Sequence, residues 1–385
     1  MSPDLILVAI SMFLWGFGEG LFLFFQPIYL QQLGADAIKI GAILSAFGVA
    51  MLVSHLPAGY LADRLGRRSV MIAAWFLGLL ATWAMALATS LTVFVIGLLL
   101  YGVTIFVISP LNSYVTAARG RWSVGRAITL ISACYNLGAV LGPWIGGRVG
   151  EQAGLRQAYF IAGFIFILST VVILFIRPQP VESQQVQPGE KPRLLNQRYL
   201  IYLGAILLAA FAMYLPQPFT PTFLQDQRGL ALSQIGQLYS ITSIGVVVLN
   251  MLVGQLPPRT GFLLGQLAVG SFALILWTRT GLSWFQAGFF LLGGFKTARS
   301  MGIAQVRQLV QGSQMGMAYG LAETMGATAV VLAPLLAGYL YTRQPTWIYT
   351  LSAGLIFISV IVSARFSPAP GVAGKENPEM IPSAD

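Results

Sequence analysis

The sequence predicts an all-α integral membrane protein in which twelve transmembrane helices form two six-helix bundles. Hydrophobic residues occupy 56% of the 385 positions and charged residues only 9%, whereas soluble domains carry roughly 25% charged residues. Apolar stretches of about 20 residues recur along the whole chain, and a helix of that length crosses a hydrocarbon core of roughly 30 Å. A sequence repeat divides these stretches into two related halves.

The expected spans follow one another with short polar connections. In the first half they lie at about 5–28, 41–61, 69–88, 92–113, 126–147 and 157–176. In the second half they lie at about 199–222, 235–256, 261–279, 283–304, 316–341 and 346–364. Within the seventh span, Pro216, Pro218 and Pro221 indicate either a broken, flexible segment that acts as an external gate or a kinked helix.

The same pattern predicts the domain organisation. We expect an N-terminal bundle over 1–177, a cytoplasmic linker over 178–198, a C-terminal bundle over 199–366 and a disordered cytoplasmic tail over 367–385. The linker is rich in proline and charge, which rules out a further span there. The tail is rich in Pro and Glu, a composition typical of disorder.

The net charge of +10 is explained by membrane orientation rather than by nucleic-acid binding. If the N-terminus is inside, cytoplasmic segments hold fourteen Lys and Arg residues and external loops hold six. This bias follows the positive-inside rule. We therefore expect a multi-pass protein of the plasma (inner) membrane, with both termini cytoplasmic and no nucleic-acid partner. The lone Cys134 excludes an internal disulfide and argues against a metal site.

Two short segments carry the repeat. Residues 59–68 read GYLADRLGRR, and a degraded copy, GQLPPRTG, occupies residues 254–261, which begin 195 positions later. Because each half has six spans, the halves point the same way across the membrane as parallel repeats, an arrangement typical of transporters in which two bundles rock about a central site. Further matches at offsets of 191 or 195 are Gln26-Pro27 with Gln217-Pro218, Ile40-Gly41 with Ile235-Gly236, Pro143 with Pro334, and Gly147 with Gly338.

With twelve spans, a linker in mid-chain and this loop, the chain resembles the major facilitator superfamily. The resemblance implies that the loop latches the cytoplasmic side of the two bundles in the outward-facing state, with Asp63 and Arg64 in the latch. The second copy has Pro258 where an Asp would lie, so it lacks an acidic latch residue. The residues that match the family's signature loop between its second and third spans are Gly59, Asp63, Arg64, Gly66, Arg67 and Arg68.

The fifth predicted span carries a second resemblance to this family. Its segment 138–147, GAVLGPWIGG, is similar to a Gly-Pro-Gly-Gly motif common in members that export substrate in exchange for protons. Gly138, Gly142, Gly146 and Gly147 line a helix face with small residues, which permits close packing, and Pro143 permits bending. Plain helix packing and a direct gating role both remain open for this segment. An intramembrane Arg, which the family uses for proton coupling in its fourth span, is absent here.

Ionisable residues inside the membrane are costly, so each one indicates a function. Glu19 lies near the middle of the first span, between Gly16, Gly18 and Gly20, which leave space around it. We expect this carboxylate to carry a proton or a cation, or else to be satisfied by neighbouring helices. The family resemblance places the first, fourth, seventh and tenth spans around the cavity, so Lys296 of the tenth span is expected on the wall opposite Glu19.

Further residues have candidate roles in the same region. Arg299 shares a helix face with Lys296, and it is expected to line the cavity or to pair with Glu323 in a structural salt bridge. His55, the only histidine, is a candidate for proton coupling, with hydrogen-bonded packing as the alternative. The aromatic candidates for contact with an amphipathic substrate, with core packing as the alternative, are Trp15, Phe22, Phe24, Tyr101, Tyr114 and Tyr214.

The predicted function is secondary active transport of a small molecule by alternating access. We favour a proton-coupled exporter (antiporter) of amphipathic or drug-like compounds, with Glu19 as the proton or cation site and Lys296 as a substrate or counter-charge site. The alternative is an importer or facilitator of a small organic anion or sugar, in which Lys296 binds the anion. A membrane sensor or scaffold is disfavoured because the chain has no sizeable soluble domain.

The sequence gives no sign of an enzyme. It contains no nucleotide-binding Gly-Lys-Ser/Thr loop, and Glu19 and Glu323 in separate halves do not make a catalytic pair. We therefore expect no catalytic residues and no cofactor, with a proton gradient as the energy source. The expected partners are a small-molecule substrate and the lipid bilayer, and the expected working unit is a monomer.

Overall fold

The computed structural model describes residues 2–179, 197–310 and 315–368, apart from the side chains of 55–63, 315 and 316. Every regular element in these ranges is a helix, which confirms the all-α fold class predicted from the sequence. Most of the predicted linker at 178–198 and nearly all of the predicted tail at 367–385 lie outside the described residues.

The helices follow the order of the predicted spans. Several begin at a side-chain cap: the side chains of Ser2, Asp36, Ser90 and Ser123 each accept a hydrogen bond from the backbone N–H three residues later. In residues 2–179 the elements are α1 (Pro3–Phe22), η1 (Leu23–Phe25), α2 (Gln26–Gln32), α3 (Ala37–Leu65), α4 (Arg67–Leu87), α5 (Leu91–Val103), η2 (Thr104–Val107), α6 (Ile108–Ala118), α7 (Val124–Ala153) and α8 (Leu155–Leu174). In residues 197–310 and 315–368 they are α9 (Gln197–Tyr214), η3 (Gln217–Phe219), α10 (Thr220–Arg228), α11 (Leu232–Val253), α12 (Pro258–Thr278), α13 (Leu282–Leu292), α14 (Gly294–Val306), α15 (Met315–Arg343) and α16 (Trp347–Phe366).

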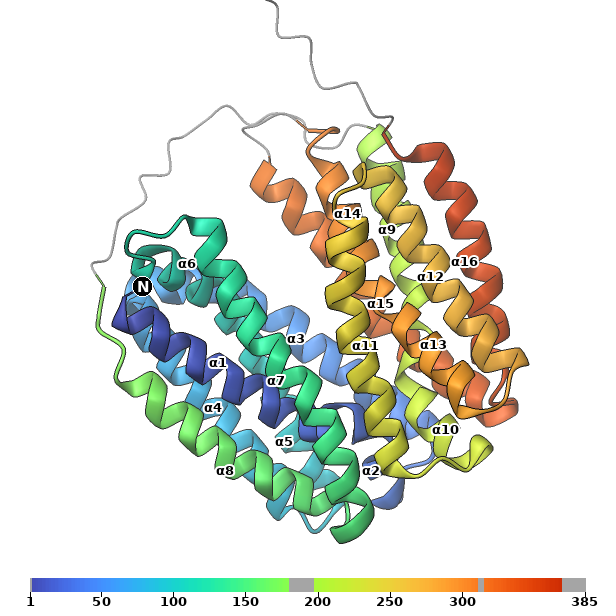
Figure 1. Ribbon diagram of the computed structural model, residues 1–385, viewed down its shortest axis with the longest axis horizontal. Coiled ribbons are helices and arrows are strands. Elements are labelled where there is room, and N and C mark those ends of the chain that lie inside the picture. The colour runs from blue at the N-terminus through green and yellow to red at the C-terminus, as the bar shows by residue number, and fades with distance from the viewer. Residues whose placement is uncertain (1, 180–196, 311–314, 369–385) are drawn as a thin grey trace, which may run out of the picture.

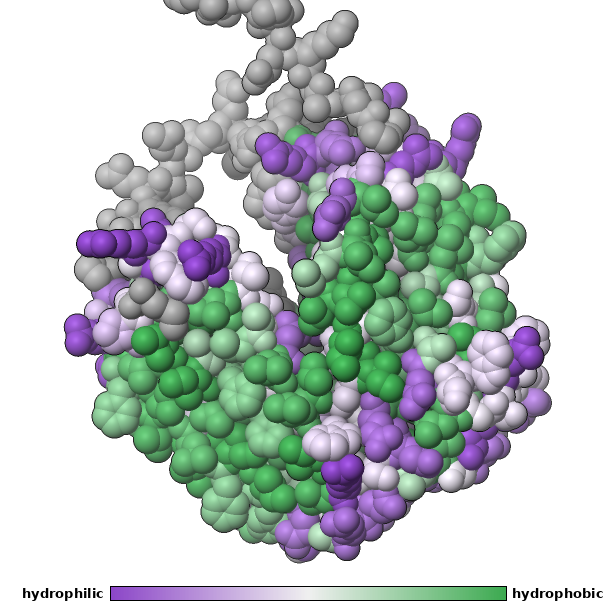
Figure 2. Space-filling model, viewed as in Figure 1, coloured by the Kyte–Doolittle hydropathy of each residue, from purple (hydrophilic) through white to green (hydrophobic). Residues whose placement is uncertain are grey.

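The two halves of the chain form two bundles that meet at one end of the molecule and diverge at the other (Figure 1). They meet at the end that contains α2 and α10, which we call the far side. They diverge at the end where α8 finishes and α9 begins, which we call the linker side. The main contacts between the halves are those of α7 with α11 and of α3 with α15. Figure 2 shows the resulting cleft as a hollow between the halves at the linker side.

Four spans are interrupted, and they are the four that the family resemblance places around the cavity. The first is divided into α1, η1 and α2, the fourth into α5, η2 and α6, the seventh into α9, η3 and α10, and the tenth into α13 and α14. The break predicted at the prolines of the seventh span is present, because α9 ends at Tyr214 and α10 begins at Thr220. By contrast, α7 and α15 continue through Pro143 and Pro334.

The outer surface of the bundles is apolar. Figure 2 shows a broad hydrophobic band on the visible face, with hydrophilic residues gathered toward both ends. Phe164 and Leu168 on α8, and Phe357 and Ile361 on α16, are each more than half exposed. Eleven of the spans in the described chain are long and apolar enough to cross a membrane. The predicted tenth span at 283–304 is instead two short helices, because Gly293 separates α13 from α14.

Candidate functional site

A cavity of about 470 Å³ lies in the concave face of the first half. Its walls come from α1, α3, α4, α7 and the broken fourth span, and in the part of the chain that the structure describes no residue of the second half lines it. Ile108, Asn112 and Ser132 at its edge are exposed, whereas Trp75 and Tyr101 are buried. The volume is typical of a pocket for a small organic molecule, which occupies about 300–1,000 Å³.

Glu19 provides the acidic group of this cavity. It lies on α1, is half-buried, and accepts a hydrogen bond of 2.9 Å from the Tyr135 hydroxyl on α7. The hydroxyl of Tyr101, also in the lining, is buried and interacts with the Glu19 carboxylate. A carboxylate and two tyrosine hydroxyls thus lie together in a largely apolar cavity.

Aromatic rings form the wall beside Glu19. Trp15 stacks on Phe166 with ring centroids 4.5 Å apart, and it lies tilted against Trp75 at 5.1 Å. The indole N–H of Trp75 donates to the hydroxyls of Ser11 and Ser169, at 2.8 and 2.9 Å. Because these three polar side chains are buried and satisfied, they hold α1, α4 and α8 together and fix the orientation of the Trp75 ring.

Lys296 approaches Glu19 from the other half of the molecule. It lies on α14, its side chain is exposed, and its charge interacts electrostatically with Glu19. The ion pairs found among the described residues are Lys39–Asp36 and Arg299–Glu323, so Lys296 and Glu19 are not in direct contact. The two opposite charges therefore face one another across the cleft between the halves.

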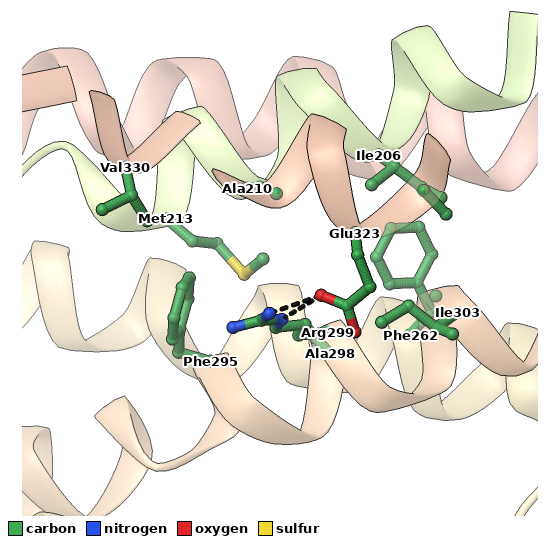
Figure 3. Close-up of a pocket in the computed structure, with 13 residues that line it drawn as sticks. Ile206, Ala210, Met213, Phe262, Phe295, Ala298, Arg299, Ile303, Glu323 and Val330 are labelled. Atoms are coloured by element: carbon green, nitrogen blue, oxygen red, sulfur yellow. Dashed lines mark hydrogen bonds and ion pairs between the residues drawn. The ribbon is translucent and has the colours of Figure 1, made fainter. Parts of the chain in front are cut away.

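Arg299 is engaged within its own half. It pairs with Glu323, as the salt-bridge interpretation of the sequence predicted, and Figure 3 shows the two side chains reaching toward each other from facing helices. Its Nε donates at 3.2 Å to the carboxylate oxygen that also accepts from a terminal nitrogen. The pair lines a pocket of only about 30 Å³, together with Ala210, the repeat counterpart of Glu19. The second half thus has an internal ion pair where the first has an open cavity.

We expect Arg299→Met and Glu323→Gln each to lower the thermal unfolding temperature of the purified protein more than the double variant does. Each single change leaves one charge without its partner. Because the side chains are 52% and 46% exposed, we expect a cost of about 1–2 kcal/mol, below the roughly 3–5 kcal/mol of a fully buried pair. Thermal unfolding in detergent measures the difference. A double variant as unstable as the sum of the single variants would show that the pair contributes nothing.

At the far side, the repeat-related Gly and Pro residues contact each other across the two halves. A Cβ added to Gly236 on α11 would overlap the carbonyl oxygen of Pro143 on α7 and lie 3.2 Å from Gly147 Cα. The close approach of these backbones therefore requires glycine at the crossing. The same geometry recurs where α3 crosses α15, at Gly41, Pro334 and Gly338.

Polar contacts add to this closure. The side-chain amide of Gln31 on α2 donates to Asp226 on α10, at 3.0 Å. The backbone N–H of Ser233, at the start of α11, donates to the Glu151 carboxylate of α7, at 3.1 Å. Glu151 thereby caps a helix of the other half, where an acidic group is favoured by the helix dipole. Both contacts break if the halves separate at the far side.

The glycine motif of α7 serves two helix faces. Gly138, Gly142 and Gly146 pack against α1 within the first half, and a Cβ on Gly142 would lie 2.6 Å from both Gly20 Cα and the Phe17 carbonyl oxygen. The other two residues of the motif, Pro143 and Gly147, contact α11 in the second half. The motif therefore packs helices together both within the first half and between the halves, and a direct gating role stays a prediction.

The signature loop is described only in part. His55, Gly59 and Asp63 fall among the residues whose side chains are not described, so their proposed proton and latch roles stay predictions. Arg64 is exposed at the end of α3, and Arg67 is half-buried at the start of α4.

The rest of this loop connects two helices tightly. Gly66 joins α3 to α4 with φ = 82°, a conformation that favours glycine. Arg68 donates from Nε to the Ile176 carbonyl at 2.7 Å and from a terminal nitrogen to the Leu174 carbonyl at 3.0 Å. These bonds satisfy carbonyl groups at the end of α8. In this conformation Arg68 therefore stabilises the first half internally.

The aromatic candidates are divided among several environments. Phe22 and Tyr114 are fully buried in the core. Phe24 stacks on Tyr239 with ring centroids 4.2 Å apart, where the two halves meet. Tyr214 lies in the second half and lines neither of the two pockets described. The other two aromatic candidates, Trp15 and Tyr101, line the cavity.

Tyr135 and Trp75 are site residues that sequence reasoning missed. Tyr135 lies three residues before the glycine motif, so a polar ring so close to the motif was an available signal. Trp75 is one of eight tryptophans, and nothing in its neighbours distinguishes it. Its role depends on Ser11 and Ser169, which are far apart in the chain and become partners only in the folded bundle.

Known proteins share both the sequence pattern and the fold. The chain matches the family model of the Major Facilitator Superfamily over residues 8–262. It is 23% identical over 371 residues to multidrug resistance protein 2 of Bacillus subtilis (strain 168), which covers 92% of each chain, and 24% identical over 394 residues to the class E tetracycline resistance protein of Escherichia coli, which covers 96% of each. The fold resembles a crystal structure of the nucleoside transporter NupG with a TM-score of 0.83, over 95% of this chain and 100% of that one, at 16% identity. Since the family model matches well over half of the sequence, the chain belongs to the Major Facilitator Superfamily.

Proposed function

We propose that this transporter exports amphipathic, drug-like small molecules in exchange for protons. The proposal depends on one observation, the half-buried Glu19 carboxylate in an apolar cavity of small-molecule size. A carboxylate in a membrane interior needs a proton, a cation or hydrogen-bond donors to offset its lost hydration, so it can exchange one for another. Relatives named for multidrug and tetracycline resistance support drug-like compounds as the substrate class.

The conformation suits the loading step of such a cycle. If the termini are cytoplasmic, as the charge distribution predicts, the cleft is open to the cytoplasm (Figure 2), and the contacts at the far side close it to the outside. Substrate arriving at Glu19 then displaces a proton into the cytoplasm. Separation of the halves at the Gly236 and Gly41 crossings exposes the cavity to the outside, where a proton displaces the substrate. Alternating access is then a shift between two arrangements of the same halves.

The test uses purified protein in liposomes that contain a pH-sensitive dye. We expect addition of a transported cationic drug to move protons across the membrane in the wild type, and Glu19→Gln to abolish this signal. The substitution keeps the size and hydrogen-bonding capacity of the side chain, so the thermal unfolding temperature should stay within a few degrees of the wild type.

Asp36→Asn is the matched control. Asp36 is exposed and lies away from the cavity, and the N–H of Lys39 donates to it at 2.8 Å, which lowers the pKa of the carboxyl below its usual range. Asparagine retains this helix cap, so the control should transport normally. Undiminished proton movement in Glu19→Gln would refute the role of Glu19. Transport of a small organic anion without a proton signal would favour the facilitator alternative and direct attention to Lys296.

A further inference from the structure

We propose that the far side binds the phosphate groups of phospholipids in the adjacent leaflet, through three arginines that each lie over an exposed aromatic ring. We call these the Arg–ring pairs. They are Arg148 over Trp144, Arg279 over Trp284, and Arg343 over Tyr339. This surface is separate from the cavity, so phospholipid binding here does not depend on the proposed function.

All three arginines lie at the far side. Arg148 lies three residues before Glu151, which caps α11 of the other half at this end. Arg279 follows the end of α12, and that end is hydrogen-bonded to α10. Arg343 is the last residue of α15, a helix that contacts η3. The Arg–ring pairs therefore gather where the spans of this end leave the hydrocarbon core.

The rings of the pairs face away from the bundles. Trp144, Trp284 and Tyr339 are 37, 48 and 52% exposed. Trp and Tyr concentrate at the boundary between membrane and water, because each ring has an apolar body and a polar group. The guanidinium carbons lie 4.1, 5.0 and 5.6 Å from the three ring centres, in that order, within the range of cation–π attraction. Each ring thus holds a guanidinium group at the level of the lipid headgroups.

The other charged groups of the far side are engaged within the protein. Arg156 donates to a backbone carbonyl at the end of α4 at 2.9 Å, and Arg228 to one at the end of α12 at 3.0 Å. The acidic residues Asp36, Glu151 and Asp226 each accept a hydrogen bond. In the ranges that the structure describes, no hydrogen bond or ion pair engages the guanidinium group of any Arg–ring pair. These three groups therefore offer their N–H donors to a ligand from the membrane.

The chemistry of the pairs fits a phospholipid. A guanidinium group over a ring presents its N–H edge, because the ring occupies its face. This planar fork matches the oxygens of a phosphate group in paired hydrogen bonds. A phospholipid also brings apolar chains that lie against the ring, whereas a free phosphate ion gains no such contact and loses hydration. An exposed ring beside available N–H donors at the membrane boundary therefore favours a phospholipid phosphate.

Native mass spectrometry of the detergent-purified full chain counts the lipids that each molecule retains. The probes are dioleoyl phosphatidylglycerol and dioleoyl glucosylglycerol, which share their chains and differ in the phosphate. We expect the wild type to retain up to one phospholipid per Arg–ring pair, and at least about fivefold less of the glycolipid, the factor given by about 1 kcal/mol for a basic residue near an anionic lipid surface. Inorganic phosphate should not displace the phospholipid.

Charge removal tests the three pairs. Arg148→Gln, Arg279→Gln and Arg343→Gln should each remove one retained phosphatidylglycerol, and the triple variant should remove all of them. Lys39→Gln is the matched control, because Lys39 is an exposed base of the same side that already pairs with Asp36 at 3.5 Å. It should retain phospholipid like the wild type. The substituted side chains are exposed, so every variant should unfold within a few degrees of the wild type in lipid-free detergent.

Two variants of one pair separate a built site from general surface charge. Arg148→Lys keeps the positive charge but loses the planar fork. Trp144→Leu keeps the arginine but removes the ring that holds it. Each should lose most of the phosphatidylglycerol bound at this pair.

The contrary outcomes are distinct. Equal retention of phospholipid and glycolipid, or unchanged retention in the triple variant, would overturn phospholipid binding at the Arg–ring pairs. Full retention in Arg148→Lys would show attraction by surface charge alone. Displacement by inorganic phosphate would show a site for free anions. Either of these two results would overturn the assignment of the pairs to phospholipid.

Discussion

Replacing Gly236 with Ala is expected to hold the far side open and to reduce transport to a small fraction of the wild-type rate. The added Cβ overlaps the backbone carbonyl oxygen of Pro143, and a backbone cannot turn aside as a flexible side chain can. Overpacking of this kind costs about 1–3 kcal/mol, and roughly 1.4 kcal/mol changes an equilibrium tenfold. Because every transport cycle passes through the state closed at the far side, its loss slows the whole cycle.

Spin labels at Gln32 and Gln227 measure this effect directly. Both residues are exposed on the far side, at the ends of α2 and α10, and Cys134→Ser removes the single native cysteine. We expect the distance between the labels to lengthen in Gly236→Ala. Gly204→Ala is the control, because an added Cβ there meets nothing within 4 Å. An unchanged distance distribution would refute the view that this crossing closes the far side.

The symmetry of the repeat provides an internal check on the same idea. Gly41 packs against Pro334 as Gly236 packs against Pro143. Gly41→Ala should therefore lengthen the same distance, and the two substitutions together should lengthen it further. The two crossings act in parallel on one rigid-body motion, so each substitution is expected to shift the equilibrium toward the open far side.

Replacing Gly142 with Val is expected to have an effect of a different kind, the loss of the folded first half. The Cβ would lie 2.6 Å from both Gly20 Cα and the Phe17 carbonyl oxygen, and all three residues belong to the same bundle. The contact is present whichever side of the protein is open, so no conformational shift can relieve it. We expect destabilisation at or above the upper end of about 1–3 kcal/mol. Size-exclusion chromatography after detergent extraction should show little folded protein.

Gly125→Val is the control on the same helix. Gly125 is exposed near the start of α7, and an added Cβ meets nothing within 4 Å. This variant should be extracted and should unfold like the wild type. If Gly142→Val gave normal yield and stability with altered transport alone, then the α1–α7 contact would be a moving one, contrary to the assignment of these two helices to one rigid half.

Much of the fold was predictable because it depends on local properties of the chain. Apolar length determines a span, and the recurrence of Ile40-Gly41 as Ile235-Gly236 is visible in the sequence alone. Only the structure shows that Gly236 contacts Pro143 and that Gly41 contacts Pro334. A match between two repeats does not indicate that the matched residues touch. The interruption at Thr104–Val107 contains no Pro or Gly from which it could be predicted. The breaks in the tenth and seventh spans, by contrast, coincide with Gly293 and with a group of prolines.

The site was predictable where a residue conflicts with its surroundings. Glu19 and Lys296 are charges in apolar spans, and Arg299 and Glu323 were paired by the cost of leaving either one alone. Tyr135 and Trp75 are not unusual in an apolar span, because aromatic residues are common in membrane helices, so the sequence does not single them out. Which of them faces the cavity depends on the rotation of α7 and α4, and that rotation is determined by packing rather than by the chain itself.

The interrupted spans give the protein four transmembrane segments that can bend within their length. A continuous helix transmits a push at one end to the other, whereas a helix divided near its centre can tilt its two segments separately. The divided spans differ in this respect from the continuous α3, α7, α11 and α15, which make the main contacts between the halves. The continuous helices can therefore transmit the large motion of one half against the other, while the divided helices adjust locally to different ligands without disturbing that motion.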